Sequence, residues 1–236
     1  MTLRTIILTT CLLLGVLGTK AQDEPEYRME IGAGAGLQSY VGDLDANIVR
    51  GQSPLAGLVA KYKPTPRTAW SANLRFGKLE GSSEHVETIY PLLAGQPWKF
   101  KTKTVDFDIS FEYNFWPYGT GQEYHGARPF TPFIALGMGL TFANADVTGM
   151  ETFKKSSAGF QMPFGIGIKY KVANRLNLSA EWLMHFTGTD KLDGMTDPYG
   201  IKSSGLFKNT DCYSTLQLSL TYDLWTKCKT CMNDDD

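Results

Sequence analysis

The sequence predicts an all-β fold: an eight-stranded, antiparallel, up-and-down transmembrane β-barrel. Three observations favour it. Apolar and polar residues alternate with a period of two along eight segments, which are separated by turns rich in Gly, Pro, Asn and Asp. The connections between these segments tend to alternate between tight and long. Aromatic residues gather near both ends of the segments, as they do at the two interfaces of a membrane barrel.

The segment from Val105 to Phe115 carries the clearest pattern. Its odd-numbered positions are apolar, and its even-numbered positions are polar and include three carboxylates. Side chains of a strand alternate between its two faces, so one face is apolar and the other is charged. A tilted strand needs about 9–11 residues to cross a bilayer, which this segment provides. The same alternation suits a soluble sandwich or a lipocalin-like barrel, so other features have to decide.

The three strands expected before this segment follow the same rule. Tyr27 to Val41 has an apolar residue at nearly every second position. Leu55 to Tyr62 comes next and ends at the proline-rich turn Lys63 to Arg67, because proline interrupts strand pairing. Trp70 to Phe76 alternates apolar residues with Ser, Asn and Arg. A long polar loop then leads to the strand that begins near Val105.

Four further strands are expected after it. Pro132 to Phe142 is rich in glycine, and its alternate positions are apolar. Phe160 to Tyr170 alternates large apolar residues with Gln, Gly and Lys. A short turn at Ala173 and Asn174 leads to Leu176 to Phe186. After a loop over 188–209, Leu216 to Leu224 closes the set.

Connection lengths and aromatic residues favour a membrane barrel over a soluble one. The second and third strands, and the sixth and seventh, are joined by tight turns. The third and fourth, fifth and sixth, and seventh and eighth are joined by long loops, and the fourth and fifth by an intermediate one. Outer-membrane barrels have short periplasmic turns and long external loops, so both termini are expected in the periplasm. The aromatic residues expected near the periplasmic end are Tyr27, Tyr62, Trp70, Tyr113, Phe115, Phe133, Tyr170, Tyr222 and Trp225, and those near the opposite rim are Phe100, Phe142, Phe160, Phe186 and Tyr213.

The N-terminus indicates export. Residues 1–21 have a basic residue, a short apolar core and small residues before Ala21, which is the pattern of a cleavable signal peptide. Residues 22–225 are then expected to form an outer-membrane barrel and residues 226–236 a short periplasmic tail. Removing Arg4 and Lys20 changes the formal charge of −1 by −2, to −3. This near-neutral balance argues against nucleic acid as a partner.

The polar faces of the strands predict a filled lumen. An eight-stranded barrel is just wide enough for side chains to fill. Buried charges that lack a partner cost several kcal/mol each, so we expect these residues to pair across the lumen. The charged residues expected to point inward are Arg75, Asp106, Asp108, Glu112, Lys169, Lys171 and Glu181.

A catalytic reading of the same lumen is the less favoured one. His185 near Glu181 would suit acid–base chemistry, as in a lipid-modifying barrel enzyme. The sequence shows no Ser-His-acid arrangement and no metal-ligand spacing, however. We therefore predict that the protein is not an enzyme, with no catalytic residue, metal site, cofactor or small-molecule substrate.

Three cysteines remain in the mature chain. Cys228 and Cys231 form a C-x-x-C pair after the last strand, where the periplasm permits oxidation. A local disulfide is favoured over metal binding, since one such pair is only half of a zinc site, and a link to another protein is a third option. Cys212 falls on the lipid-facing register at the opposite end of the barrel.

The order of several short motifs resembles the PorG-type barrels of the Bacteroidetes type IX secretion system. The matching pieces extend over nearly the whole mature chain. Cys212 departs from the pattern, which puts little in doubt. The pieces are Tyr40 to Leu44, Glu112 to Gly119, Pro132-Phe133, Pro163 to Tyr170, Arg175 to Leu178, Glu181-Trp182, Thr189 to Gly194, Asp211 to Ser214, Thr221-Tyr222, and Cys228 with Cys231.

The resemblance implies a non-enzymatic component of a protein-export machine. It also implies an association, in the periplasm, with a ring built from the PorK lipoprotein and PorN. The expected role is to tether this ring to the outer membrane and its lipid. The alternative is a general small structural or adhesive barrel that acts through its external loops. The contact residues expected for the ring are Lys63, Arg67, Trp116, Pro117, Tyr118, Cys228 and Cys231.

Overall fold

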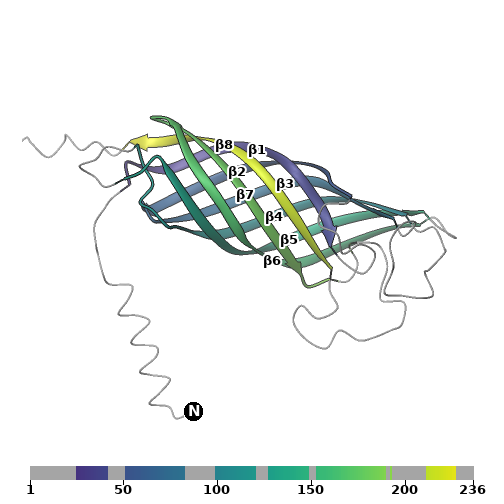
Figure 1. Ribbon diagram of the computed structural model, residues 1–236. Coiled ribbons are helices and arrows are strands. Elements are labelled where there is room, and N and C mark those ends of the chain that lie inside the picture. Colours follow the sequence, from purple (N-terminus) through teal and green to yellow (C-terminus); the bar gives the residue numbers. More distant parts are fainter. Residues whose placement is uncertain are drawn as a thin grey trace, which may run out of the picture.

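The computed structural model is a closed barrel of eight antiparallel strands, joined in chain order (Figure 1). It describes residues 25–41, 51–82, 99–120, 127–148, 153–189, 192 and 211–226. In this part of the chain no helix is long and apolar enough to cross a membrane. The strands are β1 (Tyr27–Val41), β2 (Ser53–Thr65), β3 (Thr68–Ser82), β4 (Lys99–Asn114), β5 (Phe130–Thr148), β6 (Phe153–Ala173), β7 (Leu176–Thr187) and β8 (Cys212–Thr226).

The first and last strands close the barrel. β1 pairs with β8 in antiparallel register from Tyr27 opposite Thr226 to Val41 opposite Cys212. Every other strand pairs with its neighbours in sequence, which is the up-and-down arrangement. A closed barrel leaves no strand edge with unpaired backbone groups, as a bilayer demands. The predicted fold class and all eight predicted strands are confirmed.

The two ends of the barrel differ. At one end, which we call the tight-turn end, β1 begins, β8 ends, and short turns join β2 to β3 and β6 to β7. At the other, the long-loop end, the connection from β3 to β4 spans residues 83–98 and that from β7 to β8 spans residues 188–211. The predicted long connection between the fifth and sixth strands is wrong, because β5 and β6 extend the ladder until only residues 149–152 separate them.

The outer face of the barrel is apolar and its interior is polar. On β4 the exposed side chains include Phe107, Ile109 and Phe111, whereas the alternating Asp108 and Glu112 are buried. The same alternation continues around all eight strands. Large apolar side chains on the outside of a closed sheet are stable only against lipid. The protein is therefore a small outer-membrane β-barrel.

This polarity inverts near the long-loop end of β4 and β5. Outward positions are apolar up to Val105 and Phe142, and the next outward residues are Lys103 and Asn144. Inward positions change in the opposite sense. The buried apolar side chains gathered there are Tyr40, Leu79, Phe100, Ala143, Ala145, Val147, Leu192 and Tyr213.

The inversion marks the level at which these strands leave the membrane. Beyond it, the outer face meets water or headgroups, and the inner face packs as an ordinary water-soluble core does. In Figure 1, the long-loop ends of β3 to β6 reach farther than those of β1 and β8. The projecting strands thus form a small capped extension above the bilayer.

The aromatic girdles agree with the prediction except at three inward positions. Near the tight-turn end, exposed aromatic side chains include Trp70, Tyr113 and Tyr170. Phe133, Phe100 and Tyr213 were expected in the girdles but are buried inside the barrel. The reason at Phe133 is the opposite Gly167: a Cβ there would lie 2.4 Å from the ring, so only glycine leaves room for it in the lumen.

Candidate functional site

The middle of the lumen is occupied by the side chain of Arg75, which is fully buried. Its Nη1 pairs with the Asp108 carboxylate, its Nη2 donates to Glu181 Oε1 at 3.0 Å, and its Nε donates to Gln217 Oε1 at 2.9 Å. These partners come from β4, β7 and β8, so one guanidinium on β3 joins opposite walls. The fork geometry of arginine suits this because its donors lie in one plane.

A second cluster lies nearer the tight-turn end. Glu112 accepts from Lys61 at 2.9 Å and from Lys169 at 2.5 Å. The Lys169 ammonium also donates to Asn114 Oδ1 at 3.1 Å and lies 4.6 Å from the centre of the Phe133 ring. This ring contact stabilises the cation and gives the inward Phe133 a role in the lumen.

A third cluster closes the lumen at the tight-turn end. Asp223 pairs with Lys63 at 2.7 Å and with Lys171 at 2.6 Å, and Lys63 also pairs with Glu30 at 2.6 Å. Thr221 donates to the second Glu30 oxygen at 2.9 Å. The sequence missed Glu30, Lys61, Lys63 and Asp223 as lumen residues. Each lies one residue from large apolar or aromatic neighbours in the period-two pattern of its strand, and that position in the sequence would have identified it.

The three clusters balance in charge. Their cations are Lys61, Lys63, Arg75, Lys169 and Lys171, five in all, and their carboxylates are Glu30, Asp108, Glu112, Glu181 and Asp223, also five. The predicted pairing across the lumen is therefore confirmed for six of the seven residues named from the sequence. Asp106 is equally buried but forms no ion pair among the described residues, so the prediction is wrong for that residue.

The long-loop end of the lumen is closed by the apolar cluster described above. Tyr40 and Phe100 meet edge to face with ring centres 5.1 Å apart. The backbone of Leu192 is held from two sides: its N–H donates to Asp211 Oδ2 at 2.8 Å, and its carbonyl accepts from Thr102 at 2.6 Å. Together with the ion pairs below, this cluster fills the barrel along its length.

His185 does not meet Glu181. Its Nδ1 lies 2.7 Å from Gln161 Oε1 and its Nε2 lies 3.0 Å from Thr215 Oγ1, while its ring stacks on Tyr213 at 4.4 Å. Glu181 is engaged by Arg75 instead. Across the described ranges, no three His, Cys, Asp or Glu side chains gather in a way that could hold a metal ion.

The residues predicted to contact a partner separate into two groups. The sequence predicts that Lys63 lies in an exposed turn. In the structure β2 continues to Thr65, and the Lys63 side chain is buried in the lumen. Tyr118 is also buried and donates to Asn177 Oδ1 at 2.9 Å across the mouth of the barrel. Burial, with the Glu30 and Asp223 carboxylates nearby, raises the pKa of the Tyr118 phenol. Neither side chain is therefore exposed in a turn as expected, and their contact with a partner stays a prediction.

The other predicted contacts that the structure describes form one surface at the tight-turn end. Arg67 Nη1 donates to the Phe115 carbonyl at 2.8 Å, and the Tyr118 N–H donates to the Pro66 carbonyl at 3.0 Å. These bonds tie the turn between β2 and β3 to the segment after β4. Cys228 and Cys231, like residues 1–21, lie outside the described residues.

Trp116 is the centre of this surface. Its ring is 5.8 Å from that of Phe130, and the Arg128 guanidinium lies 5.5 Å from its centre. Trp116, Phe130, Arg67 and Arg128 are all exposed, and Pro117 is half-buried. We call these residues the turn-end patch: Arg67, Trp116, Pro117, Arg128 and Phe130.

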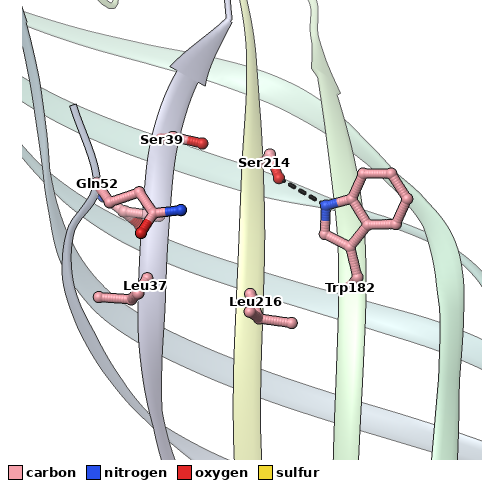
Figure 2. A pocket seen from close by; sticks show the side chains of 7 residues that line it. Leu37, Ser39, Gln52, Trp182, Ser214 and Leu216 are labelled. Carbon is pink, nitrogen blue, oxygen red and sulfur yellow. Dashed lines mark hydrogen bonds between the residues drawn. The ribbon is translucent and has the colours of Figure 1, made fainter. Parts of the chain in front are cut away.

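A hollow of about 390 Å³ lies on the outer face between β1, β7 and β8 (Figure 2). Ser39 and Ser214 are cross-strand partners, and the Trp182 indole N–H donates to Ser214 Oγ at 2.8 Å. The lining side chains include no acid, base or metal ligand, so the hollow offers space for an apolar group. They are Leu37, Gln38, Ser39, Gln52, Trp182, Ser214 and Leu216.

Known structures similar to this one include several bacterial barrels. Neisserial surface protein A is 13% identical with a TM-score of 0.45, and covers 83% of this chain and 97% of its own. Ail, the attachment invasion locus protein of Yersinia pestis, is 11% identical with a TM-score of 0.46, and covers 85% of this chain and 99% of its own. A major outer membrane protein from Thermus thermophilus is 13% identical with a TM-score of 0.49, and covers 83% of this chain and 99% of its own.

Sequence comparison gives a family. No curated protein matches the chain. A family model described as a domain of unknown function, DUF6089, matches residues 4–233, which is nearly the whole sequence. This small outer-membrane β-barrel therefore belongs to the DUF6089 family.

Proposed function

We propose that this barrel is a non-enzymatic outer-membrane component of a type IX protein secretion machine. In this role its tight-turn end faces the periplasm and tethers a periplasmic ring of PorK and PorN type. The resemblance to PorG-type barrels supplies the identity of the machine and of the ring. The filled lumen is the structural observation that carries the tethering role.

The filled lumen favours a function carried out at the ends of the barrel and not through it. Five cations and five carboxylates pair across it, and an apolar cluster caps it. Breaking one buried pair costs about 3–5 kcal/mol, so opening a path through all three clusters is prohibitive. A barrel that does not transmit a substrate acts by anchoring something at its ends.

The tight-turn end offers a surface suited to a partner. Exposed Trp116 and Phe130 lie beside the cations Arg67 and Arg128. Tryptophan and arginine are enriched among the residues that dominate binding energy at protein interfaces. Short turns face the periplasm in outer-membrane barrels, which supports a periplasmic position for this patch and for both termini. Its exposed positive charge suits an acidic partner surface.

Capture of the ring from native membranes tests the proposal. A tagged barrel, extracted in mild detergent, is expected to bring down PorK-like and PorN-like proteins that mass spectrometry identifies. Arg67→Gln/Arg128→Gln is expected to lower their recovery about tenfold, since truncating an interface arginine often costs more than about 1 kcal/mol. Lys99→Gln/Lys101→Gln at the long-loop end removes the same charge and should recover the ring at the wild-type level.

Both variants must first be shown to fold, by the heat-dependent shift of the barrel on a denaturing gel. Equal ring recovery from the two double variants would remove the turn-end patch from the proposal. A wild-type barrel that captures no ring, even after cross-linking, would overturn the proposed function itself.

The alternative is a small structural or adhesive barrel that acts through its external loops. One observation favours it: β3 to β6 project beyond the level where the outer face stops being apolar, which places the ends of these strands clear of the bilayer. Deleting most of 83–98 should leave secretion intact under the tethering proposal. Loss of surface adhesion with intact secretion would favour the alternative.

We also propose that the barrel has no lipid-modifying activity. Both ring nitrogens of His185 already contact Gln161 and Thr215 inside the barrel. His185→Ala is therefore expected to leave the acyl pattern of outer-membrane lipids unchanged, as measured by mass spectrometry of lipid extracts. An altered pattern in a variant that still folds would contradict this and revive the enzyme reading.

A further inference from the structure

Two lysines occupy the first outward positions above the apolar belt at the long-loop end. Lys78 of β3 and Lys103 of β4 are direct cross-strand partners, and both side chains are exposed. Two residues along each strand towards the membrane, Phe76 and Val105 are also partners and belong to the apolar outer face. The lysine pair therefore stands at the height of lipid headgroups.

The positive charge of this lysine pair is not neutralised by the acidic side chains nearby. Glu80 lies 3.4 Å from Lys101 Nζ, one row farther from the membrane, and Asp146 is the cross-strand partner of Lys101. Among the described residues, no carboxylate forms an ion pair with Lys78 or Lys103. On the other side of Lys103, its cross-strand partner on β5 is Asn144, whose side-chain amide is uncharged and also faces outward.

Such a pair is unfavourable without a counterion. Side chains directly opposite on neighbouring strands have Cβ atoms about 5 Å apart, and like charges in that arrangement destabilise a sheet. An anion between the two ammonium groups would offset the repulsion and accept charge-assisted hydrogen bonds from both. The Asn144 amide could donate a further bond to the same anion.

We propose that Lys78, Lys103 and Asn144 form a binding site for the phosphate of a lipid headgroup. The lipid is one whose acyl chains lie against the apolar belt, which includes Phe76, Val105 and Phe142 directly below. In the orientation proposed above, the long-loop end lies at the outer leaflet, so the phosphorylated glycolipid of that leaflet is the occupant. The site does not involve the turn-end patch, and failure of ring capture leaves it standing.

Binding of lipid A to the folded, full-length barrel tests the site. Native mass spectrometry in detergent is expected to show lipid A retained by the wild type and released from Lys78→Gln/Lys103→Gln, with affinity lower by about thirtyfold. Lipid A stripped of its phosphates should bind the wild type as weakly as lipid A binds the double variant. Arg175→Gln, which removes an exposed charge at the tight-turn end, should bind like the wild type.

A reversed charge separates lipid binding from a structural role. Lys103→Glu creates an ion pair with Lys78, so without lipid it should raise the urea midpoint of unfolding above that of the wild type. The same variant should lose the stabilisation that lipid A gives the wild-type barrel. Retained lipid A stabilisation in Lys103→Glu, or equal binding of phosphorylated and dephosphorylated lipid A, would overturn the proposal.

Discussion

Arg75→Met is expected to lower the free energy of unfolding of the barrel by about 3–5 kcal/mol. The substitution roughly keeps the length of the side chain but removes the guanidinium of the middle cluster, leaving Asp108 and Glu181 buried. Two buried carboxylates that have lost their cation are strongly unfavourable. Urea unfolding from lipid vesicles, followed by tryptophan fluorescence, measures the loss.

Two further variants show that the loss comes from uncompensated charge. Arg75→Met/Asp108→Asn/Glu181→Gln removes all three charges together and is expected to recover at least half of the lost stability, because neutral groups of similar volume tolerate the same site. Lys101→Gln breaks the exposed pair with Glu80 and should change stability by no more than about 1 kcal/mol. A single Arg75→Met variant as stable as the wild type would mean that water reaches this cluster.

Met138→Arg is expected to have the second-largest effect, a loss of about 2–4 kcal/mol. Met138 is 64% exposed on the outer face of β5, between the apolar Leu136 and Leu140. An arginine at this height would face hydrocarbon. The matched control is Asn144→Arg on the same face of the same strand, beyond the inversion. Its expected loss from membrane depth is about 0–1 kcal/mol, and repulsion from the opposite Lys103 adds up to about 1 kcal/mol.

Folding into vesicles of defined thickness, with urea titration, compares the two arginine variants. A large difference between them places the membrane boundary between Met138 and Asn144. Equal losses would contradict that boundary and would also remove the headgroup position on which the lysine site depends.

The strand count could be predicted because period-two alternation is a local property, whereas the closed antiparallel order was indicated by the connection lengths and the aromatic positions. Within each strand, apolar residues that face outward alternate with polar residues that face inward, as Phe107 and Asp108 do on β4. The residues at which strands end were harder to predict from the sequence. Pro64 suggested a turn, yet β2 continues through it, because its neighbour Lys63 has partners inside the barrel that hold the strand in place.

The exposure of some residues at the tight-turn end could also be predicted from local patterns, whereas their contact with a partner stays a prediction. Arg67 and Trp116 lie in connections whose position the alternation fixes, and both are exposed at the tight-turn end. Tyr118 follows Trp116 by two residues but turns back over the lumen to Asn177. No local pattern distinguishes the two aromatic residues, since the choice depends on a partner 59 residues away.

Eight strands, each with one apolar and one polar face, follow from the sequence alone because alternation is a property of each strand. Connection lengths and aromatic positions, which are also visible in the sequence, favoured the membrane barrel over a soluble one. The pairing of the lumen charges, by contrast, depends on the closed barrel and cannot be read from any one strand. Lys63 finds Asp223 across 160 residues of chain, and Arg75 finds Glu181 across 106, once barrel closure brings the strands together. The fold also shows where the apolar outer face ends, because Lys78 and Lys103 become neighbours only when β3 pairs with β4.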